Sequence, residues 1–349
     1  MAKRAENVLL TRFSALGDVA MTIPVVYDAC NACPDVNFIF LTGKHQARLF
    51  VNKPANLTVE GLDTGLLKSF RSLAKLASRL KREYHPDMCL DLHDVLRTKV
   101  IRTLLRLKGV RTYHISKGRA AKRALTRPNN KLLVQLKPTP ERYREVFAAA
   151  GIPAMGTFSS VFGDCKGPVA DFAAVTPPKQ PGTRWLAIAP FAKHDGKIYP
   201  PQLMKQVVDH FAVRPECRTF IFGFGSDECD RIDAMAQGRD NVVNMARAAI
   251  GINAEMSLLS HCDVMLSMDS ANMHLASLVG LPAVTVWGAT HPFAGFLGIN
   301  QKADDICQLD LTCRPCSVYG NRPCRRGDYH CLYGIPPALI CDKLSRYMR

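Results

Sequence analysis

Residues 264–287 have the sequence VMLSMDSANMHLASLVGLPAVTVW, and this stretch decides the fold class. An apolar strand is predicted over 264–268, followed by a small, polar turn and a helix that begins near Ala271. Leu281-Pro282 then leads into a second apolar strand over 283–287. Because strand, helix and strand form the repeating unit of parallel sheets, the stretch predicts an α/β protein.

The same alternation continues along the rest of the chain. Short apolar or β-branched runs predict strands, and apolar residues at helical spacing predict helices. The further predicted strands are 7–12, 36–42, 88–92, 185–189 and 218–222. The further predicted helices are 19–32, 65–81, 95–107, 201–213, 227–237 and 337–347. The apolar face of the helix over 65–81 is predicted to be Leu66, Leu67, Phe70, Leu73, Leu76 and Leu80.

A break rich in proline and glycine interrupts this alternation over 164–184 and predicts an interdomain linker. At about 150 residues per domain, 349 residues also suggest two domains. We therefore expect two Rossmann-like, doubly wound α/β domains facing a cleft, over 1–165 and 184–335, followed by a C-terminal helix within 336–349.

The composition indicates a folded protein that is not secreted. The apolar run Val8–Leu10 stops at Thr11 and Arg12, which is too short for a signal peptide. No stretch reaches the roughly 20 apolar residues that span a bilayer. Most of the 13 cysteines are scattered through apolar segments, as expected of small buried residues in a reducing compartment. The sequence predicts a cytoplasmic protein.

The net charge of +16 is concentrated in residues 65–150, which hold 21 Lys and Arg against 6 Asp and Glu. Such a basic region attracts anionic lipid, a phosphorylated substrate or nucleic acid, or it only keeps the protein soluble. Nucleic-acid binding would call for aromatic residues among the basic ones. Apart from histidine, Tyr113 is the only aromatic residue between 85 and 137, so we expect no nucleic-acid partner.

Ligands of open parallel sheets bind beyond the carboxyl ends of the strands, so the strand-to-helix turns are the candidate sites. The first turn, Phe13–Asp18, places Asp18 as a general base or as a carboxylate that stabilises its own helix. The second turn, Pro190–Lys197, offers Lys193 or Lys197 to a diphosphate, unless both lysines are merely solvated.

Two later turns are further candidates. Gly223–Glu228 begins like a dinucleotide fingerprint but lacks the third glycine, so it is weak evidence for a nicotinamide oxidoreductase. Glu228 there contacts a sugar or caps its helix. In Asp269–His274, small residues allow a diphosphate to approach a helix N-terminus, although Asp269 is also a candidate N-cap and His274 a candidate half-buried helix residue.

These turns, in this order, resemble glycosyltransferase family nine, the ADP-heptose:lipopolysaccharide heptosyltransferases. Arg12–Val19 with Thr22-Ile23-Pro24 looks like the N-terminal signature of the family. The segment from Pro190 to Lys197 ahead of Tyr199-Pro200 resembles its middle motif. Asp269–Ala276, with Gly280-Leu281-Pro282 and Trp287–Thr290, resembles its C-terminal signature.

The resemblance implies a GT-B fold, with the acceptor bound by the first domain and the nucleotide sugar by the second, and a C-terminal helix that crosses back to the first domain. It implies metal-independent, inverting transfer with no cofactor. Asp18 would be the catalytic base, and Arg97, Ser14 and Gly17 would bind the acceptor. The implied donor-binding residues are Lys197, Asp269, Ser270, Ala271, His274, Phe191, Ala192 and Glu228.

The implied partners are a nucleotide-sugar donor, expected to be ADP-heptose, and a phosphorylated, lipid-linked acceptor of the lipopolysaccharide core type. The basic region of the first half suits peripheral contact with an anionic membrane at the inner face of the inner membrane. Its expected surface contributors are Arg71, Lys75, Arg79, Lys81 and Arg82, together with a mobile loop over 117–127. The alternatives are another donor sugar, or a non-catalytic protein that binds a nucleotide sugar.

Cysteines crowd together near the end of the sequence. Cys313, Cys316, Cys324 and Cys331 follow the spacing C-x2-C-x7-C-x6-C, with Cys307 nearby. A zinc site usually shows a second C-x-x-C pair, which is missing here. We therefore interpret the cluster as a structural loop, with bound metal as the alternative.

Overall fold

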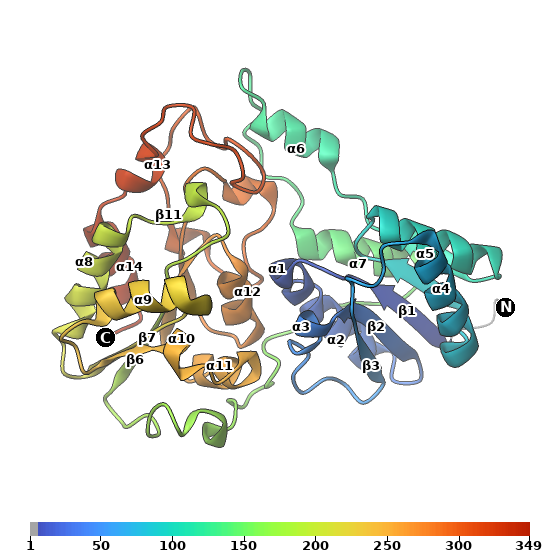
Figure 1. The fold of residues 1–349 in the computed structure, drawn as a ribbon, viewed down its shortest axis with the longest axis horizontal. Coiled ribbons are helices and arrows are strands. Elements are labelled where there is room, and N and C mark those ends of the chain that lie inside the picture. Colours follow the sequence, from blue (N-terminus) through green and yellow to red (C-terminus); the bar gives the residue numbers. More distant parts are fainter. Residues whose placement is uncertain (1–5) are drawn as a thin grey trace. The chain divides into compact units, whose positions relative to one another are not determined.

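The computed structural model describes residues 6–349 (Figure 1). The first five residues of the predicted first domain lie outside the described residues. The chain divides into two compact units. Unit 1 comprises the described residues up to 118 together with 137–161, and unit 2 comprises 119–136 together with 162–349.

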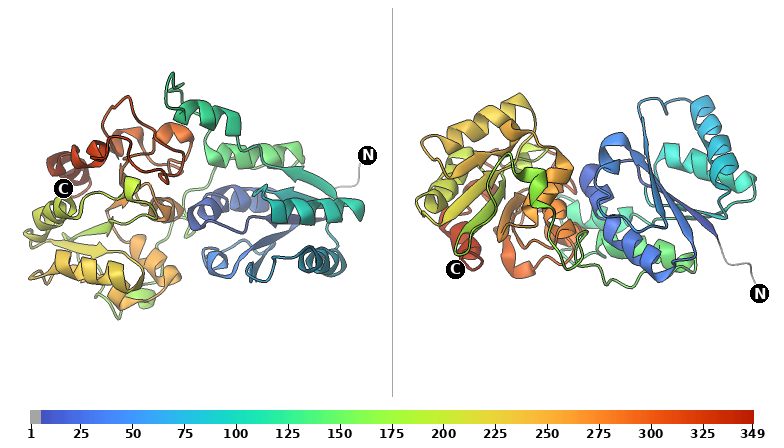
Figure 2. Two further views of the ribbon diagram at one scale, coloured as in Figure 1. Left: turned by 45° about the horizontal axis from the view of Figure 1, so that its top comes forward. Right: turned by 90° about the horizontal axis from the view of Figure 1, so that it is seen from below.

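Unit 1 contains a five-stranded sheet in which neighbouring strands are parallel, in the order β3–β2–β1–β4–β5. Helices α4 and α5 cover one face of this sheet, and α2 and α7 cover the other (Figure 2). The strands are β1 (Asn7–Thr11), β2 (Asn37–Gly43), β3 (Leu57–Leu62), β4 (Met88–Asp91) and β5 (Arg111–His114). The helices are α1 (Leu16–Ala20), α2 (Ile23–Ala32), α3 (Lys44–Ala47), α4 (Phe70–Tyr84), α5 (Leu96–Leu107) and α7 (Thr139–Ala149).

The helix predicted over 19–32 is in fact two helices, α1 and α2. Thr22 is the N-cap of α2, and Pro24 lies in its first turn. Proline lacks an N–H group and fits a helix without cost only in the first turn, so Pro24 marks a helix start. The short helix α1 carries Asp18 in its own first turn.

The apolar face predicted for residues 65–81 is only partly correct. Helix α4 begins at Phe70, because the Ser69 side chain caps it by accepting a hydrogen bond from the Ser72 N–H at 3.1 Å. Leu66 precedes the helix and is 73% exposed, and Phe70 is 67% exposed. The residues of α4 that do reach the core of unit 1 are Leu73, Leu76, Ala77 and Leu80.

Unit 2 contains a six-stranded parallel sheet in the order β11–β10–β9–β6–β7–β8. Its strands are β6 (Arg184–Ala189), β7 (Cys217–Ile221), β8 (Val242–Asn244), β9 (Val264–Met268), β10 (Ala283–Val286) and β11 (Ile306–Cys307). Its helices are α6 (Arg119–Thr126), α8 (Pro201–Ala212), α9 (Gly225–Ala236), α10 (Met245–Ala248), α11 (Ile252–Leu259), α12 (Ala271–Leu278), α13 (His330–Tyr333) and α14 (Pro337–Ser345).

Both sheets have the same strand order. In each unit the first strand lies between the second and the fourth, as β1 lies between β2 and β4 and as β6 lies between β7 and β9. The winding direction reverses beside this first strand, and open α/β sheets bind ligands at that point, beyond the carboxyl ends. We call the loops after β1 and β4 the unit 1 edge, and the loops after β6 and β9 the unit 2 edge.

The predicted interdomain linker over 164–184 is packed rather than free. Phe172 is fully buried, and its ring meets the ring of Trp185 edge-on at 6.0 Å. The Lys179 ammonium lies 2.7 Å from the Asp263 carboxylate. The proline-rich composition therefore marks an irregular segment that belongs to unit 2.

Two other segments also belong to unit 2. Residues 119–136 do so because Leu125 and Leu136 are buried against Ala294, and 119–126 form α6 instead of the predicted mobile loop. The C-terminal helix α14, predicted to cross back to the first domain, instead buries Ile340, Cys341 and Leu344 in the core of unit 2, where it packs on α8. Within residues 6–349, no helix combines the length and the apolarity needed to cross a bilayer.

Candidate active site

The unit 1 edge presents Asp18 in the first turn of α1. Its Oδ2 lies 2.6 Å from the Arg12 Nη2 and accepts a hydrogen bond from the Ala15 N–H at 3.3 Å. The Arg12 side chain is 8% exposed and donates from Nη1 to the Leu92 carbonyl at 2.9 Å, whereas the Asp18 side chain is 28% exposed. The cation is therefore buried and fixed, and the carboxylate is the partner that faces solvent.

The adjacent loop, after β4, is organised by the fully buried Asp91. Its carboxylate accepts hydrogen bonds from the N–H groups of His93 and Asp94 at 3.0 and 2.9 Å. It also accepts from the Thr11 hydroxyl at 3.2 Å and pairs with Arg102 at 2.9 Å. Asp91 thus ties the end of β1 to the end of β4.

His93 is a buried, neutral imidazole at this edge. Burial, followed by the neighbouring cations Arg12, Lys117 and Arg97, lowers the pKa of His93 to about 3, and Asp18 opposes this shift only in part. Its Nδ1 accepts a hydrogen bond from the Phe13 N–H at 3.3 Å, so the ring proton resides on Nε2. Cations thus gather around this edge, as recognition of an anionic substrate requires.

The three predicted acceptor residues also lie at the unit 1 edge. Ser14 is exposed and Gly17 is half-buried, both on the turn that carries Asp18. Arg97 is exposed at the start of α5, where its Nη1 donates to the Thr64 carbonyl at 2.8 Å. The structure therefore gathers Ser14, Gly17, Asp18 and Arg97 at one edge, on the loop after β1 and on the first turns of α1 and α5.

The unit 2 edge has an ion pair between its two loops. Lys197, from the loop after β6, has its Nζ 3.0 Å from the Oδ2 of Asp269, from the loop after β9. The Lys197 side chain is 16% exposed and the Asp269 side chain 7%. Here the carboxylate is buried, and the cation is the more open partner.

The second loop of this edge leads into α12. Ser270 is the N-cap, so the alternative of Asp269 as N-cap is wrong. The Ser270 side chain makes no capping hydrogen bond, so it does not occupy the first-turn N–H groups of α12. His274 is 6% exposed on the same helix. An anion at this point would meet both a helix N-terminus and Lys197.

The remaining predicted donor-binding residues, Phe191, Ala192 and Glu228, make contacts within unit 2 that occupy their side chains. Phe191 is 6% exposed in the core of unit 2, with the Arg231 guanidinium 5.0 Å from its ring centre, so its side chain is withdrawn from the edge. Ala192 packs against the same core. The Glu228 carboxylate accepts a hydrogen bond from the Phe224 N–H at 2.7 Å, which is the capping alternative for this residue.

Sequence reasoning missed Arg314, which braces the unit 2 edge. Its side chain is 2% exposed, and its Nη2 donates to the carbonyls of Trp287 and Thr290 at 3.0 and 2.9 Å. The Gly288 carbonyl accepts from its Nε. Arg314 therefore holds the loop after β10, which in turn meets the Lys197 loop through the hydrogen bond from the Ala289 N–H to the Gly196 carbonyl at 2.7 Å.

Gly320 was also missed, although it positions Lys197. Its φ of +75° favours glycine, and a Cβ there would lie 2.6 Å from the Cγ and Cδ of Lys197. The alkyl chain of Lys197 thus runs over the bare backbone of Gly320. Both missed residues come from the cysteine-rich segment, so this segment supports the unit 2 edge.

The cysteines of this segment differ in their surroundings. Cys307 and Cys331 belong to the buried core of unit 2, Cys316 is buried, and Cys313 and Cys324 are half-buried. The Cys316 thiol lies 3.5 Å from the Cys313 carbonyl. Burial raises the pKa of the Cys331 thiol to about 11, which keeps it protonated in the absence of a ligand.

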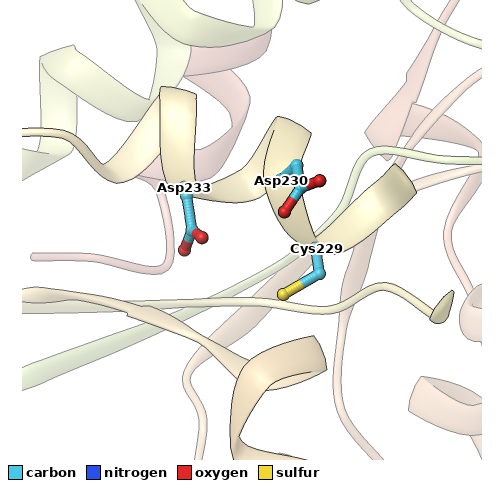
Figure 3. A group of neighbouring side chains, drawn as sticks. All are labelled: Cys229, Asp230 and Asp233. Carbon is cyan, nitrogen blue, oxygen red and sulfur yellow. The ribbon is translucent and has the colours of Figure 1, made fainter. Parts of the chain in front are cut away.

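The structure does bring together one group of possible metal ligands, on α9 (Figure 3). Over residues 6–349, Cys229, Asp230 and Asp233 are the one set of three or more ligand atoms within 4.8 Å of one another. The Asp233 carboxylate already pairs with Arg247 and accepts from the Asn244 amide at 2.7 Å. These hydrogen bonds lower the pKa of Asp233 and compete with any cation, so we assign no metal to this group.

Two α/β units with Rossmann-like strand order are the architecture of glycosyltransferases of the GT-B type. A sequence profile for glycosyltransferase family 9 (heptosyltransferase) matches residues 73–325, and the chain belongs to this family. The predicted resemblance to this family is thereby confirmed, and the middle and C-terminal signatures lie within the matched residues.

Individual relatives agree with this assignment. The chain is 21% identical over 317 residues to lipopolysaccharide heptosyltransferase 1 of Pseudomonas aeruginosa, covering 89% of this chain and 86% of the relative. Its fold is similar to that of E. coli heptosyltransferase WaaC with ADP-2-deoxy-2-fluoro heptose, with a TM-score of 0.65, 17% identity, and coverage of 97% and 99%. It is also similar to E. coli ADP-heptose lipopolysaccharide heptosyltransferase II, with a TM-score of 0.68, 12% identity and 98% coverage of both chains.

Proposed function

We propose that this glycosyltransferase moves a heptose from ADP-heptose to a lipopolysaccharide core-type acceptor, with inversion at the anomeric carbon. The donor is suggested by the names of the similar structures, which specify ADP, ADP-2-deoxy-2-fluoro heptose or ADP-heptose. The observation that carries the proposal is the opposite polarity of the two edges: Asp18 is the open partner in unit 1, and Lys197 in unit 2.

Unit 2 is the proposed donor unit. The Lys197 ammonium and the first-turn N–H groups of α12 supply the positive charge that a diphosphate needs, both before and after it leaves. Asp269 fixes the ammonium, while Ser270 and Ala271 are small enough to let the phosphates approach. His274, Ala192, the backbone of Phe191 and Glu228 complete the proposed pocket.

Unit 1 is the proposed acceptor unit. Asp18 takes the proton of the acceptor hydroxyl as that oxygen attacks the anomeric carbon of the heptose. The new C–O bond forms on the face opposite the breaking C–O bond to the diphosphate, so the configuration inverts and ADP leaves. Arg97, with Ser14 and Gly17, holds the phosphorylated acceptor. Positive charge on the protein replaces a metal ion, so we propose metal-independent transfer without a cofactor.

The protein is proposed to act in the cytoplasm, peripherally at the inner face of the inner membrane. A lipid-linked acceptor lies in the bilayer, and the 21 cations against 6 acids of residues 65–150 favour its anionic surface. Nucleic acid is not a proposed partner.

The proposal is tested by ligand binding followed by transfer. In a thermal-shift screen of ADP, GDP and UDP, we expect ADP to raise the unfolding midpoint most, because a ligand that binds the native state stabilises it. Labelled ADP-heptose should then pass its sugar to a core acceptor with EDTA present, and NMR of the product should show an inverted anomeric centre. A preference for UDP or GDP would instead support another donor sugar. Binding without transfer would support a non-catalytic nucleotide-sugar-binding protein.

A further inference from the structure

One segment of unit 2 combines positive charge and exposed apolar surface outside both edges. Residues 117–137 contain seven Lys and Arg and no Asp or Glu. Within them, 119–136 form what we call the α6 hairpin: helix α6, a turn, and a chain that returns beside the helix (Figure 1). The hydrogen bond from the Leu132 N–H to the Ala124 carbonyl, at 3.2 Å, joins the two arms.

The base of the α6 hairpin is firmly attached to unit 2. Leu125 and Leu136 are buried against Ala294, and the Leu136 N–H donates to the Phe293 carbonyl at 2.9 Å. The Lys122 ammonium lies 4.3 Å from the ring centre of Phe296. The Lys131 ammonium donates to the Thr312 carbonyl at 3.2 Å and also to that of Cys313. These contacts use two cations and two leucines of the hairpin for anchoring.

The rest of the α6 hairpin is turned outward. Leu132, Leu133 and Val134 are consecutive and are 54%, 46% and 56% exposed. Three exposed aliphatic residues in a row are unfavourable in water and are expected only where they bind something. Arg119, Arg123 and Arg127, at a spacing of four residues, are all exposed and line one side of the helix and its end. Because Leu132 bonds to Ala124, the apolar run begins beside Arg123.

We propose that the α6 hairpin is the membrane-docking element of this protein and that its partner is a bilayer surface rich in anionic phospholipid. Apolar residues enter the boundary between headgroups and acyl chains, while neighbouring cations pair with the headgroup phosphates. Charge complementarity favours this partner, since 117–137 hold no acid that would repel it. The absence of aromatic residues from 119–136 argues against single-stranded nucleic acid. The inference rests on the proposed lipid-linked acceptor and identifies the surface that reaches it.

The test is co-sedimentation of the full-length protein with vesicles that contain neither donor nor acceptor. One set is phosphatidylglycerol with phosphatidylcholine in equal parts, and the other is phosphatidylcholine alone. We expect binding to the first set that weakens steeply with salt, and little binding to the second. Arg119→Gln, Arg123→Gln and Arg127→Gln together should lower the partition coefficient on the order of 10²-fold, at about 1 kcal/mol for each cation.

The apolar run is tested separately. Leu132→Asn, Leu133→Asn and Val134→Asn together should lower the partition coefficient about tenfold or more, and should do so at high salt as well. The apolar control is Leu107→Asn, which replaces a leucine that is 79% exposed between Arg106 and Lys108. The charge control is Lys53→Gln, Lys166→Gln and Lys302→Gln, which removes three exposed cations that lie outside residues 65–150. Both controls should bind vesicles almost as the unaltered protein does.

Folding of every variant is checked by its unfolding midpoint, which needs no nucleotide. Equal losses in the controls and the hairpin variants, or undiminished binding by the hairpin variants, would overturn the inference. So would lipid-free self-association that the Asn variants abolish, because the apolar run would then bind a second copy. A protein that fails to transfer heptose but binds vesicles through the hairpin contradicts the proposed function and not the docking surface.

Discussion

The two edges share one topology and carry opposite polarity. In unit 1, the buried partner of the ion pair is Arg12 and the open partner is Asp18. In unit 2, the buried partner is Asp269 and the open partner is Lys197. The same strand order thus presents an open carboxylate, Asp18, in one unit and an open ammonium, Lys197, in the other. A fold of this kind fixes where a site lies, and the loop residues decide its chemistry.

The buried residues that hold the loop backbone at the two edges also differ in the sign of their charge. A buried carboxylate, Asp91, organises the unit 1 edge by accepting from backbone N–H groups. A buried guanidinium, Arg314, organises the unit 2 edge by donating to backbone carbonyls. In each unit the buried charge that holds loop backbone has the same sign as the open charge proposed for the substrate: both are negative in unit 1 and both are positive in unit 2. The following changes would break or sharpen this comparison.

The largest effect is expected from Asp18→Asn. Loss of the proton acceptor should lower kcat by roughly 10² to 10⁴-fold, while the amide retains a hydrogen bond to Arg12. Steady-state transfer of labelled heptose measures this. Asp63→Asn is the matched control, because Asp63 is an exposed carboxylate of unit 1 that accepts the Gly65 N–H. Near-normal turnover by Asp18→Asn would remove Asp18 from the mechanism.

Arg314→Met tests the brace of the unit 2 edge. The change leaves the carbonyls of Trp287 and Thr290 without their buried donor, so we expect a loss on the order of 3 kcal/mol in the free energy of unfolding. Denaturant titration measures it. Arg326→Met, which alters an exposed arginine of the same segment, should change stability by less than about 0.5 kcal/mol. Equal effects of the two changes would refute the bracing role.

Lys197→Met should weaken ADP binding roughly 10- to 100-fold, because it removes the cation proposed for the diphosphate. Calorimetric titration with ADP gives this value. Lys193→Met alters an exposed lysine of the same loop and should leave the affinity almost unchanged. Because Lys197→Met also leaves Asp269 unpaired, Lys197→Met with Asp269→Asn separates the loss of the cation from the loss of the pair. If Lys193 proves the more sensitive position, the assignment within this loop is reversed.

The smallest effect concerns pH and His93. Because its pKa falls from 6.5 to about 3 in the folded protein, the unfolded chain binds its proton more readily between these values. Above pH 6.5 His93 is neutral in both states and does not lower the free energy of unfolding. As the pH falls from 6.5 toward 3, protonation of His93 in the unfolded chain lowers this free energy by up to about 1.4 kcal/mol per pH unit. His93→Gln should flatten the decline of the unfolding free energy between pH 6.5 and 5. His114→Gln, at an exposed position of β5, should not.

The framework was predictable because the features that define it are local. Strands β1, β6 and β9 are apolar runs, and the turns that follow them had to lie at the carboxyl edges of parallel sheets. Asp18, Lys197 and Asp269 could be identified in this way. Pro24 marks the start of α2, but the helical spacing of the apolar residues around it led to the prediction of a single helix over 19–32.

The rest depends on contacts between residues that are far apart in sequence. Nothing near Arg314 indicates that its side chain is buried under the loop after β10, and nothing near Gly320 indicates that Lys197 crosses it. Phe191 lies in a promising turn, but its ring points into the core. Residues 119–136 belong to unit 2 because Leu125 and Leu136 meet Ala294 and because Lys131 donates to carbonyls of the cysteine-rich segment.

The central claim is that Asp18 acts on the acceptor, whereas unit 2 alone holds the nucleotide. The most direct measurement is the ADP dissociation constant of Asp18→Asn, determined on the same preparation as its single-turnover transfer rate. The account predicts a dissociation constant within about twofold of the unaltered protein and a transfer rate at least about 10²-fold lower. A transfer rate that is unchanged, or ADP affinity that falls together with the rate, would contradict it.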